Sequence, residues 1–382
     1  MLTLALLVPA SAWAEGAKRL DLRHLKTSGS VVMARGDDGE WVRTTLDPEL
    51  QRAAAAILTA AKAKEGAVVI SDVRTGRVLA WVSRGGGRDV VMTPIAPSAS
   101  VFKVITAAAL LESGHARPST KQCWSGGEKR IEEDDLDDDR ETDNRCTTLG
   151  DALGHSVNLV FARLALKHLS PSALRDEAAE LGIGSDIPID VRVPRSTLTV
   201  PEDRLGFARA AAGFWNGKLS PLSALFAMQT IARGGERLPL SVIDDGQVDE
   251  SAGRALSTST ASALTRMLEV TTRSGTSAKV FHNEDGSRVM PHLRVAGKTG
   301  TLIGGHPSRM YSWFAGFAPS RNPEIAVSVL LANDVKWWKK ANEVARDVIE
   351  AWAENRGKKR LLSALGPQLA SDTRLPPARF AS

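Results

Sequence analysis

Ser100 and Lys103 stand three residues apart in an otherwise apolar run that includes Val101-Phe102 and Val104-Ile105. An isolated ammonium group among such neighbours is costly, and loss of solvation lowers the pKa of a lysine. Residues three apart on a helix share a face, so the amine can reach the hydroxyl and act as its base. The pair predicts a serine nucleophile at a helix N-terminus, which would also help to stabilise an oxyanion. The alternative is that Ser100 only caps the helix while Lys103 extends its amine to solvent.

Ser156-Val157-Asn158 lies in a helical block in which Gly154 and His155 indicate a break between two helices. A hydroxyl and an amide two residues apart at such a break can relay a proton and hold a substrate amide. By itself the pattern is weak, because Ser320-Arg321-Asn322 has the same spacing and is typical of a turn.

Lys298-Thr299-Gly300-Thr301 ends a predicted strand that approaches through the small residues Ala296 and Gly297. Strand alternation places Thr299 and Thr301 on one face and Lys298 on the other. An extended peptide can align beside such an edge as an added strand, and the lysine charge with the two hydroxyls can hold a carboxylate. The alternative is a surface strand with a flexible turn at Gly300.

These three patterns are far more specific together than apart. Ser-x-x-Lys and Lys-Thr-Gly each occur once in the sequence. Their order and separations along the chain put the first on a predicted buried helix and the second on a predicted late strand, on either side of Ser156. On these residues the chain resembles the transpeptidase domain of penicillin-binding proteins, within the superfamily of serine β-lactamases and D,D-peptidases. The likeness covers about residues 40–355, with similar segments at 45–51, 72–76, 156–162, 212–222 and 313–317.

The resemblance implies an acyl-serine mechanism. Ser100 would attack the carbonyl of the penultimate D-alanine in a peptidoglycan stem peptide, and Lys103 would take its proton. Ser156 would relay a proton to the leaving amine while Asn158 holds the substrate amide. Lys298 would sustain the electrostatic field around Ser156.

Substrate binding is implied for the late strand. Thr299 and Thr301, joined by Gly300, would bind the terminal carboxylate, and the backbone amides of Ser100 and Thr301 would form the oxyanion hole. The amine of a second stem peptide would complete a cross-link, or water would complete a carboxypeptidase turnover. The expected partners are stem peptides ending in D-Ala-D-Ala, β-lactams as covalent inhibitors and other cell-wall synthesis proteins. No cofactor, metal or nucleic acid is expected.

Rival functions remain beside the transpeptidase. A D,D-carboxypeptidase is the nearest, and a non-catalytic sensor of β-lactams or muropeptides and an inactive scaffold are the others. The intact residues Ser100, Lys103 and Lys298 argue against a decayed site. No Glu-x-x-Leu-Asn segment follows Asn158, so the water-activating glutamate of class A β-lactamases is missing. This argues against a β-lactamase and predicts a long-lived penicilloyl adduct.

The order of the predicted strands and helices that must position these residues indicates an α+β fold. In this fold, helices cover an antiparallel sheet, and a further group of helices forms an all-helical subdomain. Early strands, a helical middle and late strands imply one sheet built from both ends of the chain. Asp47 and Pro48 are typical of a helix start. The predicted strands are 66–72, 77–83, 292–301, 310–317 and 324–333, and the predicted helices are 48–63, 100–112, 148–169, 171–181, 221–233 and 342–355.

The chain ends suggest four regions. Residues 2–13 are almost wholly apolar and end in Ala12-Trp13-Ala14, which is typical of a signal-peptidase site and predicts export to the periplasm or cell envelope. No Lys or Arg precedes this run, so we expect the true start to lie upstream, and a weak or non-functional signal and a buried N-terminal helix are the alternatives. The expected regions are a signal peptide at 1–14, an irregular linker at 15–39, the transpeptidase domain at 40–355 and a basic tail at 356–382.

Composition agrees with one large globular domain. The 382 residues are 43% hydrophobic, which is enough for a core, and no apolar run reaches the roughly 18 residues of a membrane-spanning helix. We therefore expect neither an integral membrane protein, nor a second catalytic domain, nor a separate N-terminal pedestal domain. The net charge is +5 although nine acidic residues gather in 132–143, so the remaining surface is basic and suits an anionic envelope better than nucleic acid.

The two cysteines flank this acidic segment. If Cys123 and Cys146 pair, the loop closure stabilises the fold by roughly 3 kcal/mol, and the alternative is two independent thiols. The aspartates from Asp135 to Asp139 have the spacing of a calcium loop, but Arg140 stands where the turn glycine belongs and no Glu follows at the twelfth position. A solvated loop without metal is favoured.

Trp337-Trp338-Lys339-Lys340 joins two aromatic rings to two cations. Such a group suits a peripheral contact with an anionic membrane surface. The favoured alternative is packing against the last helix.

Overall fold

The computed structural model describes residues 17–127, 130–214, 216–246, 250–304, 308–334 and 336–364, with side chains up to residue 357. The signal peptide expected at 1–14 and the part of the tail beyond residue 364 lie outside the described residues. Within the described ranges, no helix combines the length and apolarity that crossing a membrane requires.

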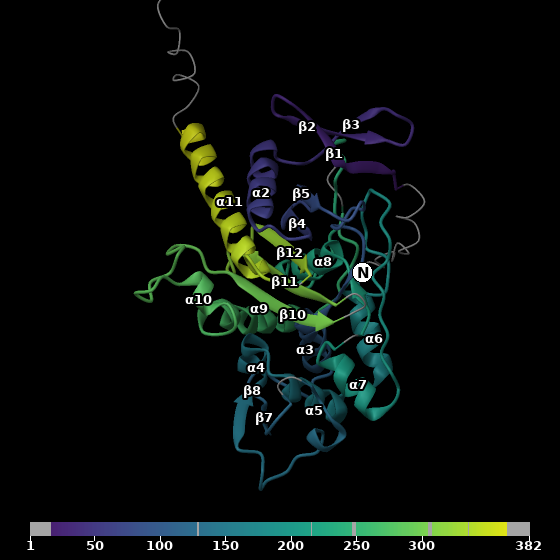
Figure 1. The fold of residues 1–382 in the computed structure, drawn as a ribbon, viewed down its shortest axis with the longest axis vertical. Helices are drawn as coiled ribbons and strands as arrows, with labels where there is room; N and C mark the ends of the chain where they lie inside the picture. The colour runs from purple at the N-terminus through teal and green to yellow at the C-terminus, as the bar shows by residue number, and fades with distance from the viewer. Residues whose placement is uncertain are drawn as a thin grey trace, which may run out of the picture.

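One five-stranded antiparallel sheet forms the centre of the molecule (Figure 1). Its strands are β4 (Glu65–Asp72), β5 (Val78–Arg84), β10 (Ala296–Gly304), β11 (Arg309–Ala318) and β12 (Ile325–Asn333), in the order β10-β11-β12-β4-β5. Early and late parts of the chain meet where β12 pairs with β4, since Ile325 faces Asp72 and Ala332 faces Glu65. Every residue of β12 is buried, because helices cover the sheet on both faces. The expected sheet built from both ends of the chain is confirmed.

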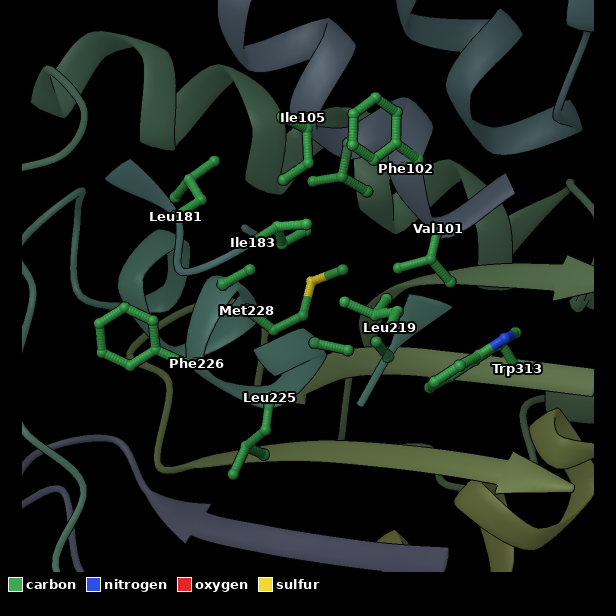
Figure 2. Packing of buried hydrophobic residues seen from close by; sticks show 14 of the residues in the cluster. Val101, Phe102, Ile105, Leu181, Ile183, Leu219, Leu225, Phe226, Met228 and Trp313 are labelled. Carbon is green, nitrogen blue, oxygen red and sulfur yellow. The ribbon is translucent and has the colours of Figure 1, made fainter. Parts of the chain in front are cut away.

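Helices on the two faces of the sheet enclose separate hydrophobic clusters. The helices concerned are α2 (Pro48–Ala60), the 3₁₀ helix η1 (Ala99–Phe102), α3 (Lys103–Glu112), α8 (Pro221–Ala232), α9 (Thr258–Arg273) and α11 (Ala341–Ala364). On one face α2 and α11 lie side by side, and on the other lie α8 and α9, with η1 against β10 and α3 against α9 (Figure 1). Figure 2 shows Val101 and Ile105 pointing toward Met228 of α8, so the segment that carries Ser100 is anchored in the core.

A helical subdomain continues from α3, in the lower part of Figure 1. It contains α4 (Leu149–His155), α5 (Asn158–His168), α6 (Pro171–Glu180), α7 (Arg204–Ala211) and the hairpin β7 (Lys121–Trp124) and β8 (Arg145–Thr148). Sequence-local capping defines its helices: the Ser170 side chain accepts from the Ala173 amide, and Pro171 occupies the first turn of α6. The expected α+β fold is confirmed, but the subdomain is not all-helical, because it contains the hairpin of β7 and β8. Short elements complete the fold, namely β6 (Ala96–Pro97), β9 (Lys218–Leu219), η2 (Glu133–Asp135) and α10 (Ala278–Phe281).

The sequence predicts an irregular linker at residues 15–39, and the structure corrects this prediction, because most of the segment folds. It supplies the strands β1 (Leu20–Ser28) and β2 (Val31–Gly36), which form a small antiparallel sheet with β3 (Trp41–Arg43). The many charged residues of this segment obscure its strand pattern in the sequence. In the structure, the alternate residues Val32 and Ala34 point into the hydrophobic core, and Leu22 belongs to the same core. The turn between β1 and β2 uses Gly29 at a positive φ of 59°.

Other boundaries also differ from the sequence prediction. Helix α11 continues to Ala364, so the expected tail at 356–382 begins as helix. Strand β10 begins at Ala296 and extends to Gly304, later at both ends than predicted. Helix α9 was missed, because its Ser- and Thr-rich sequence has weak intrinsic helix propensity. Its stability comes from the buried face that includes Leu264 and Leu268.

A disulfide joins Cys123 and Cys146, which face each other on the paired strands β7 and β8. The acidic segment between them is held by cations of the helical subdomain. Arg163, which is almost fully buried, donates to the carboxylate of Asp143 and to the carbonyl of Cys123. Arg204 forms ion pairs with the same segment.

The segment containing Trp337 and Trp338 leaves one large ring on the surface. Trp338 is 61% exposed, and the amines of Lys62 and Lys336 lie 4.8 and 5.5 Å from its ring centroid. Lys339 contacts the last helix through an ion pair with Asp347. The membrane contact and the packing of the tryptophan rings against the last helix both stay predictions.

Candidate active site

Ser100 lies in η1, just before α3, on a backbone that its neighbours constrain. Ala99 has φ of +47°, which is unfavourable for a residue with a Cβ atom. Ser98 donates a 2.6 Å hydrogen bond to Asn216, which fixes the chain immediately before this residue. Gly213 packs against the same turn, where a Cβ atom would come within 2.1 Å of the Ala99 carbonyl oxygen. The surrounding structure thus holds the strained turn that presents Ser100.

Lys103 has its amine inside the protein, with no exposed surface. Its Nζ atom lies 2.8 Å from Ser100 Oγ, 2.8 Å from Asn158 Oδ1 and 2.7 Å from the carbonyl oxygen of Ala212. Burial, with a contribution from the charge of Lys298, holds the pKa of Lys103 well below that of a solvated lysine. A neutral amine has two N–H groups for Asn158 and Ala212 and one lone pair for the Ser100 hydroxyl. The geometry suits a general base.

Ser156 and Lys298 form a second pair beside the first. Ser156 sits in the left-handed conformation, with φ of 61°, at the end of α4 and two residues before α5 begins. The Lys298 amine donates to Ser156 Oγ at 3.0 Å and to the Thr299 carbonyl at 2.8 Å. Burial lowers the pKa of Lys298 to about 7. The hydroxyl of Ser156 is therefore in contact with an amine that can exchange a proton near neutral pH.

The edge strand β10 carries the remaining predicted residues. Lys298 is buried while Thr299 and Thr301 line an open groove, as strand alternation predicts. A Cβ atom at Gly300 would lie 3.2 Å from the Ala99 Cβ, tighter than ordinary van der Waals contact. The glycine therefore permits the close approach of η1 to β10, which brings Ser100 beside the strand.

The groove has a volume of about 1080 Å³ and collects the predicted residues from separate parts of the chain. Ser100, Ser156 and Asn158 line it from the helical side, and Thr299 and Thr301 line it from the sheet. The structure therefore brings together the predicted catalytic and substrate-binding residues, with Lys103 and Lys298 in contact with Ser100 and Ser156.

Sequence reasoning missed several groove residues. Thr276 Oγ1 lies 2.6 Å from Thr299 Oγ1, and no motif around Thr276 marks it. Arg209 also lines the groove, where it shares an ion pair with Glu132 of the acidic segment. Lys340 lies at the groove as well. The tryptophans before Lys340 predict a membrane contact or packing against the last helix, but nothing in the sequence around Lys340 indicates a substrate groove.

The acidic segment shows no metal cluster among the residues that the structure describes. The Asp135 side chain accepts from the backbone amide of Glu132, and Asp137 pairs with Arg204. Asp139 accepts from Thr142. These local partners leave the carboxylates directed to different groups, as in a solvated loop.

Comparisons with known proteins point to one family. The family model of the penicillin binding protein transpeptidase domain matches residues 66–350. The chain is similar to the peptidoglycan D,D-transpeptidase PbpA of Mycobacterium tuberculosis, with 27% identity over 258 residues that cover 62% of this chain and 50% of PbpA. The chain thus spans about half the length of that relative.

Solved structures share the fold. The imipenem acyl-enzyme complex of penicillin-binding protein A from M. tuberculosis matches with a TM-score of 0.63 and 24% identity, covering 81% of this chain and 79% of that one. A peptidoglycan glycosyltransferase from Burkholderia ambifaria matches with a TM-score of 0.68 and 25% identity, covering 84% of this chain and 98% of that one.

Proposed function

The chain belongs to the penicillin-binding protein transpeptidase family, and from that membership we propose that it is a D,D-transpeptidase acting on peptidoglycan stem peptides through an acyl-serine. The observation that carries this proposal is the 2.8 Å separation between the buried Lys103 amine and the Ser100 hydroxyl. A lysine with a lowered pKa is a suitable base for a serine nucleophile.

In the proposed acylation, Ser100 Oγ bonds to the carbonyl carbon of the penultimate D-alanine and its proton moves to Lys103. The developing oxyanion accepts hydrogen bonds from the backbone amides of Ser100, in the first turn of η1, and of Thr301, on the edge strand. When the carbon–nitrogen bond breaks, Ser156 relays to the leaving amine the proton that Lys103 accepted, so Lys103 is neutral again and D-alanine departs. Lys298 supports Ser156 in this step through the contact at 3.0 Å.

In the second half, the amine of another stem peptide attacks the carbonyl carbon of the acyl-enzyme, and its proton passes to Ser156 and Lys103. These residues return the proton to Ser100 Oγ as the ester bond breaks, which regenerates Ser100 and releases the product. Water would complete the same cycle as a carboxypeptidase. Among the groove residues that the structure describes, Glu132 is the one acidic residue. Its carboxylate is paired with Arg130 and Arg209. This pairing disfavours its use in activating water, so the proposal includes slow hydrolysis of a penicilloyl adduct.

The proposal places this reaction outside the cytoplasm, in the periplasm or cell envelope. The disulfide between Cys123 and Cys146 supports that location, because such bonds persist in oxidising compartments. Fractionation of cells that produce the full chain, with the mass of the purified N-terminus, tests it. Recovery of unprocessed chain from the cytoplasm alone would contradict it.

Intact mass spectrometry after incubation with benzylpenicillin tests the site. We expect one penicilloyl adduct on the wild type that lasts for hours and is missing from Ser100→Ala. An adduct that persists in Ser100→Ala would reject the nucleophile, and rapid hydrolysis of the antibiotic would reject the transpeptidase in favour of a β-lactamase. Incubation of the protein with a stem peptide, with and without an added amine acceptor, then shows whether the acyl group passes to an amine or to water. Cross-linked product supports the transpeptidase, and hydrolysis alone supports the carboxypeptidase.

A further inference from the structure

The proposed substrate ends in a carboxylate, and the lysine of the Lys-Thr-Gly motif is a poor counter-charge for it. Lys298 has no exposed surface, and its amine already donates to Ser156 and to the Thr299 carbonyl. Burial also lowers the pKa of Lys298 to about 7, so a large fraction of this lysine is neutral at neutral pH. A carboxylate that enters the groove between Thr299 and Thr301 therefore needs a cation from elsewhere.

Lys340 is a candidate for this cation. It is exposed and lines the same groove as the two threonines. The next residue, Ala341, donates a 3.0 Å hydrogen bond from its backbone amide to Ser312 Oγ. Ser312 is the register partner of Thr301 in the β10–β11 ladder. Lys340 is thus attached to the strand directly beside the carboxylate-binding threonines.

The other side of the same segment is also held in place. Asn342 is buried, and its side-chain amide donates to Ser277 Oγ at 3.1 Å. Ser277 follows Thr276, whose hydroxyl contacts that of Thr299. Residues 340–342 therefore bridge β11 and the segment that contacts Thr299, which gives Lys340 a defined position at the rim.

The other cations of the groove that the structure describes, Arg130 and Arg209, share the carboxylate of Glu132, at 3.3 and 3.0 Å. By contrast, among the residues that the structure describes, no hydrogen bond or ion pair involves the amine of Lys340. Its backbone amide donates to Glu343, which is the nearest acid in the sequence. The ammonium group of Lys340 is thus available to a ligand.

We infer that Lys340 binds the terminal carboxylate of the acyl donor, together with the hydroxyls of Thr299 and Thr301. This inference rests on the proposed function and makes Lys340 a specificity-determining residue for ligands with a free C-terminal carboxylate. β-Lactams carry a carboxylate in the equivalent chemical position, so they serve as probes.

The test compares wild type, Lys340→Gln, Lys340→Arg and the control Lys339→Gln in their acylation by benzylpenicillin. Lys339 is the adjacent lysine, but it pairs with Asp347. We expect Lys340→Gln to lower the second-order acylation constant about ten-fold through weaker initial binding, with the limiting acylation rate unchanged. Lys340→Arg should restore most of the loss, and Lys339→Gln should match the wild type. With the methyl ester of benzylpenicillin, Lys340→Gln and wild type should react equally.

Binding to a Ser100→Ala background separates this inference from the proposed reaction. Calorimetry would measure the affinity of a peptide ending in D-Ala-D-Ala, and of its C-terminal amide, with and without Lys340→Gln. A loss confined to the free carboxylate supports the inference even if the wild type forms no penicilloyl adduct. Equal affinities in both proteins, or an equal loss for acid and amide, would overturn it even if acylation at Ser100 is found.

Discussion

The amine of Lys103 lies 2.8 Å from the hydroxyl of Ser100, one helical turn away, and is fully buried. The same amine lies 2.8 Å from Asn158 Oδ1, so one buried group links Ser100 to the helical subdomain. Because burial lowers the pKa of Lys103, the neutral amine is populated at far lower pH than for a solvated lysine. This relationship leads to the first prediction.

Replacement of Lys103 by Arg should remove the base while keeping a cation. A guanidinium stays protonated, so we expect acylation by benzylpenicillin to fall by about 10³-fold. For the wild type, the rate should stay high near neutral pH rather than fall ten-fold per pH unit below pH 10. Rates from pH 5 to 9 by mass spectrometry check both points, with circular dichroism as the control for folding. Acylation of Lys103→Arg at the wild-type rate would contradict the assignment.

Replacement of Lys298 by Met should stabilise the protein in a pH-dependent manner. Below the folded pKa of about 7, the lysine is protonated in both states, so the folded state carries the full cost of a buried charge. Between about pH 7 and 10.5 the unfolded state holds the proton that the folded state has released, so wild-type stability rises by about 1.4 kcal/mol per pH unit from this group.

Denaturant unfolding of both proteins at pH 6 and pH 10 measures this effect. We expect the advantage of Lys298→Met to be largest at pH 6 and to shrink toward pH 10, because the cost of the buried charge disappears there. The hydrogen bond to Ser156 is lost at both pH values, so it cancels in the comparison. A difference that is the same at both pH values would show that the pKa of Lys298 is not lowered.

Replacement of Gly300 by Ala should separate η1 from β10. The new methyl group would lie 3.2 Å from Ala99 Cβ and 3.3 Å from Val101 Cγ2, so the neighbours must move by a few tenths of an ångström. We expect a loss of about 1–2 kcal/mol in unfolding free energy. Acylation should fall at least about ten-fold, since Ser100 moves relative to the strand. Gly357→Ala is the control, because a Cβ atom there meets nothing within 4 Å. Equal acylation by Gly300→Ala and wild type would refute the role of this contact.

Removal of the disulfide should destabilise the fold. The bond closes a chain segment with a sequence separation of 23, for which loop closure contributes about 3 kcal/mol. We expect the Cys123→Ser/Cys146→Ser variant to unfold at lower denaturant concentration than the wild type and to be cut faster by protease between residues 124 and 145. Reduced wild-type protein is the matched control and should behave like the variant. Coincident unfolding curves for oxidised and reduced wild type would show that the bond adds no stability.

Much of the fold and the site follows from local features of the sequence. Asp47 and Ser170 start helices because their side chains accept from the first free amides, wherever the helix packs. The spacing of Ser100 and Lys103 makes them neighbours on one helical turn. The alternation around Gly300 puts Lys298 on the opposite face of its strand from Thr299 and Thr301. These relations are short-range, so backbone geometry alone determines them.

Tertiary structure decided the relations that span long stretches of chain. Lys298 and Ser156 are 142 residues apart, and the packing of α4 against α9 and of α9 against β10 brings their side chains together. Thr276 and Lys340 reach the groove through contacts with Thr299 and with β11, which no local pattern marks. Helix α9 forms despite its weak propensity, because burial of one face compensates. Periodicity and capping act over a few residues, whereas the groove depends on which surfaces find each other in the folded protein.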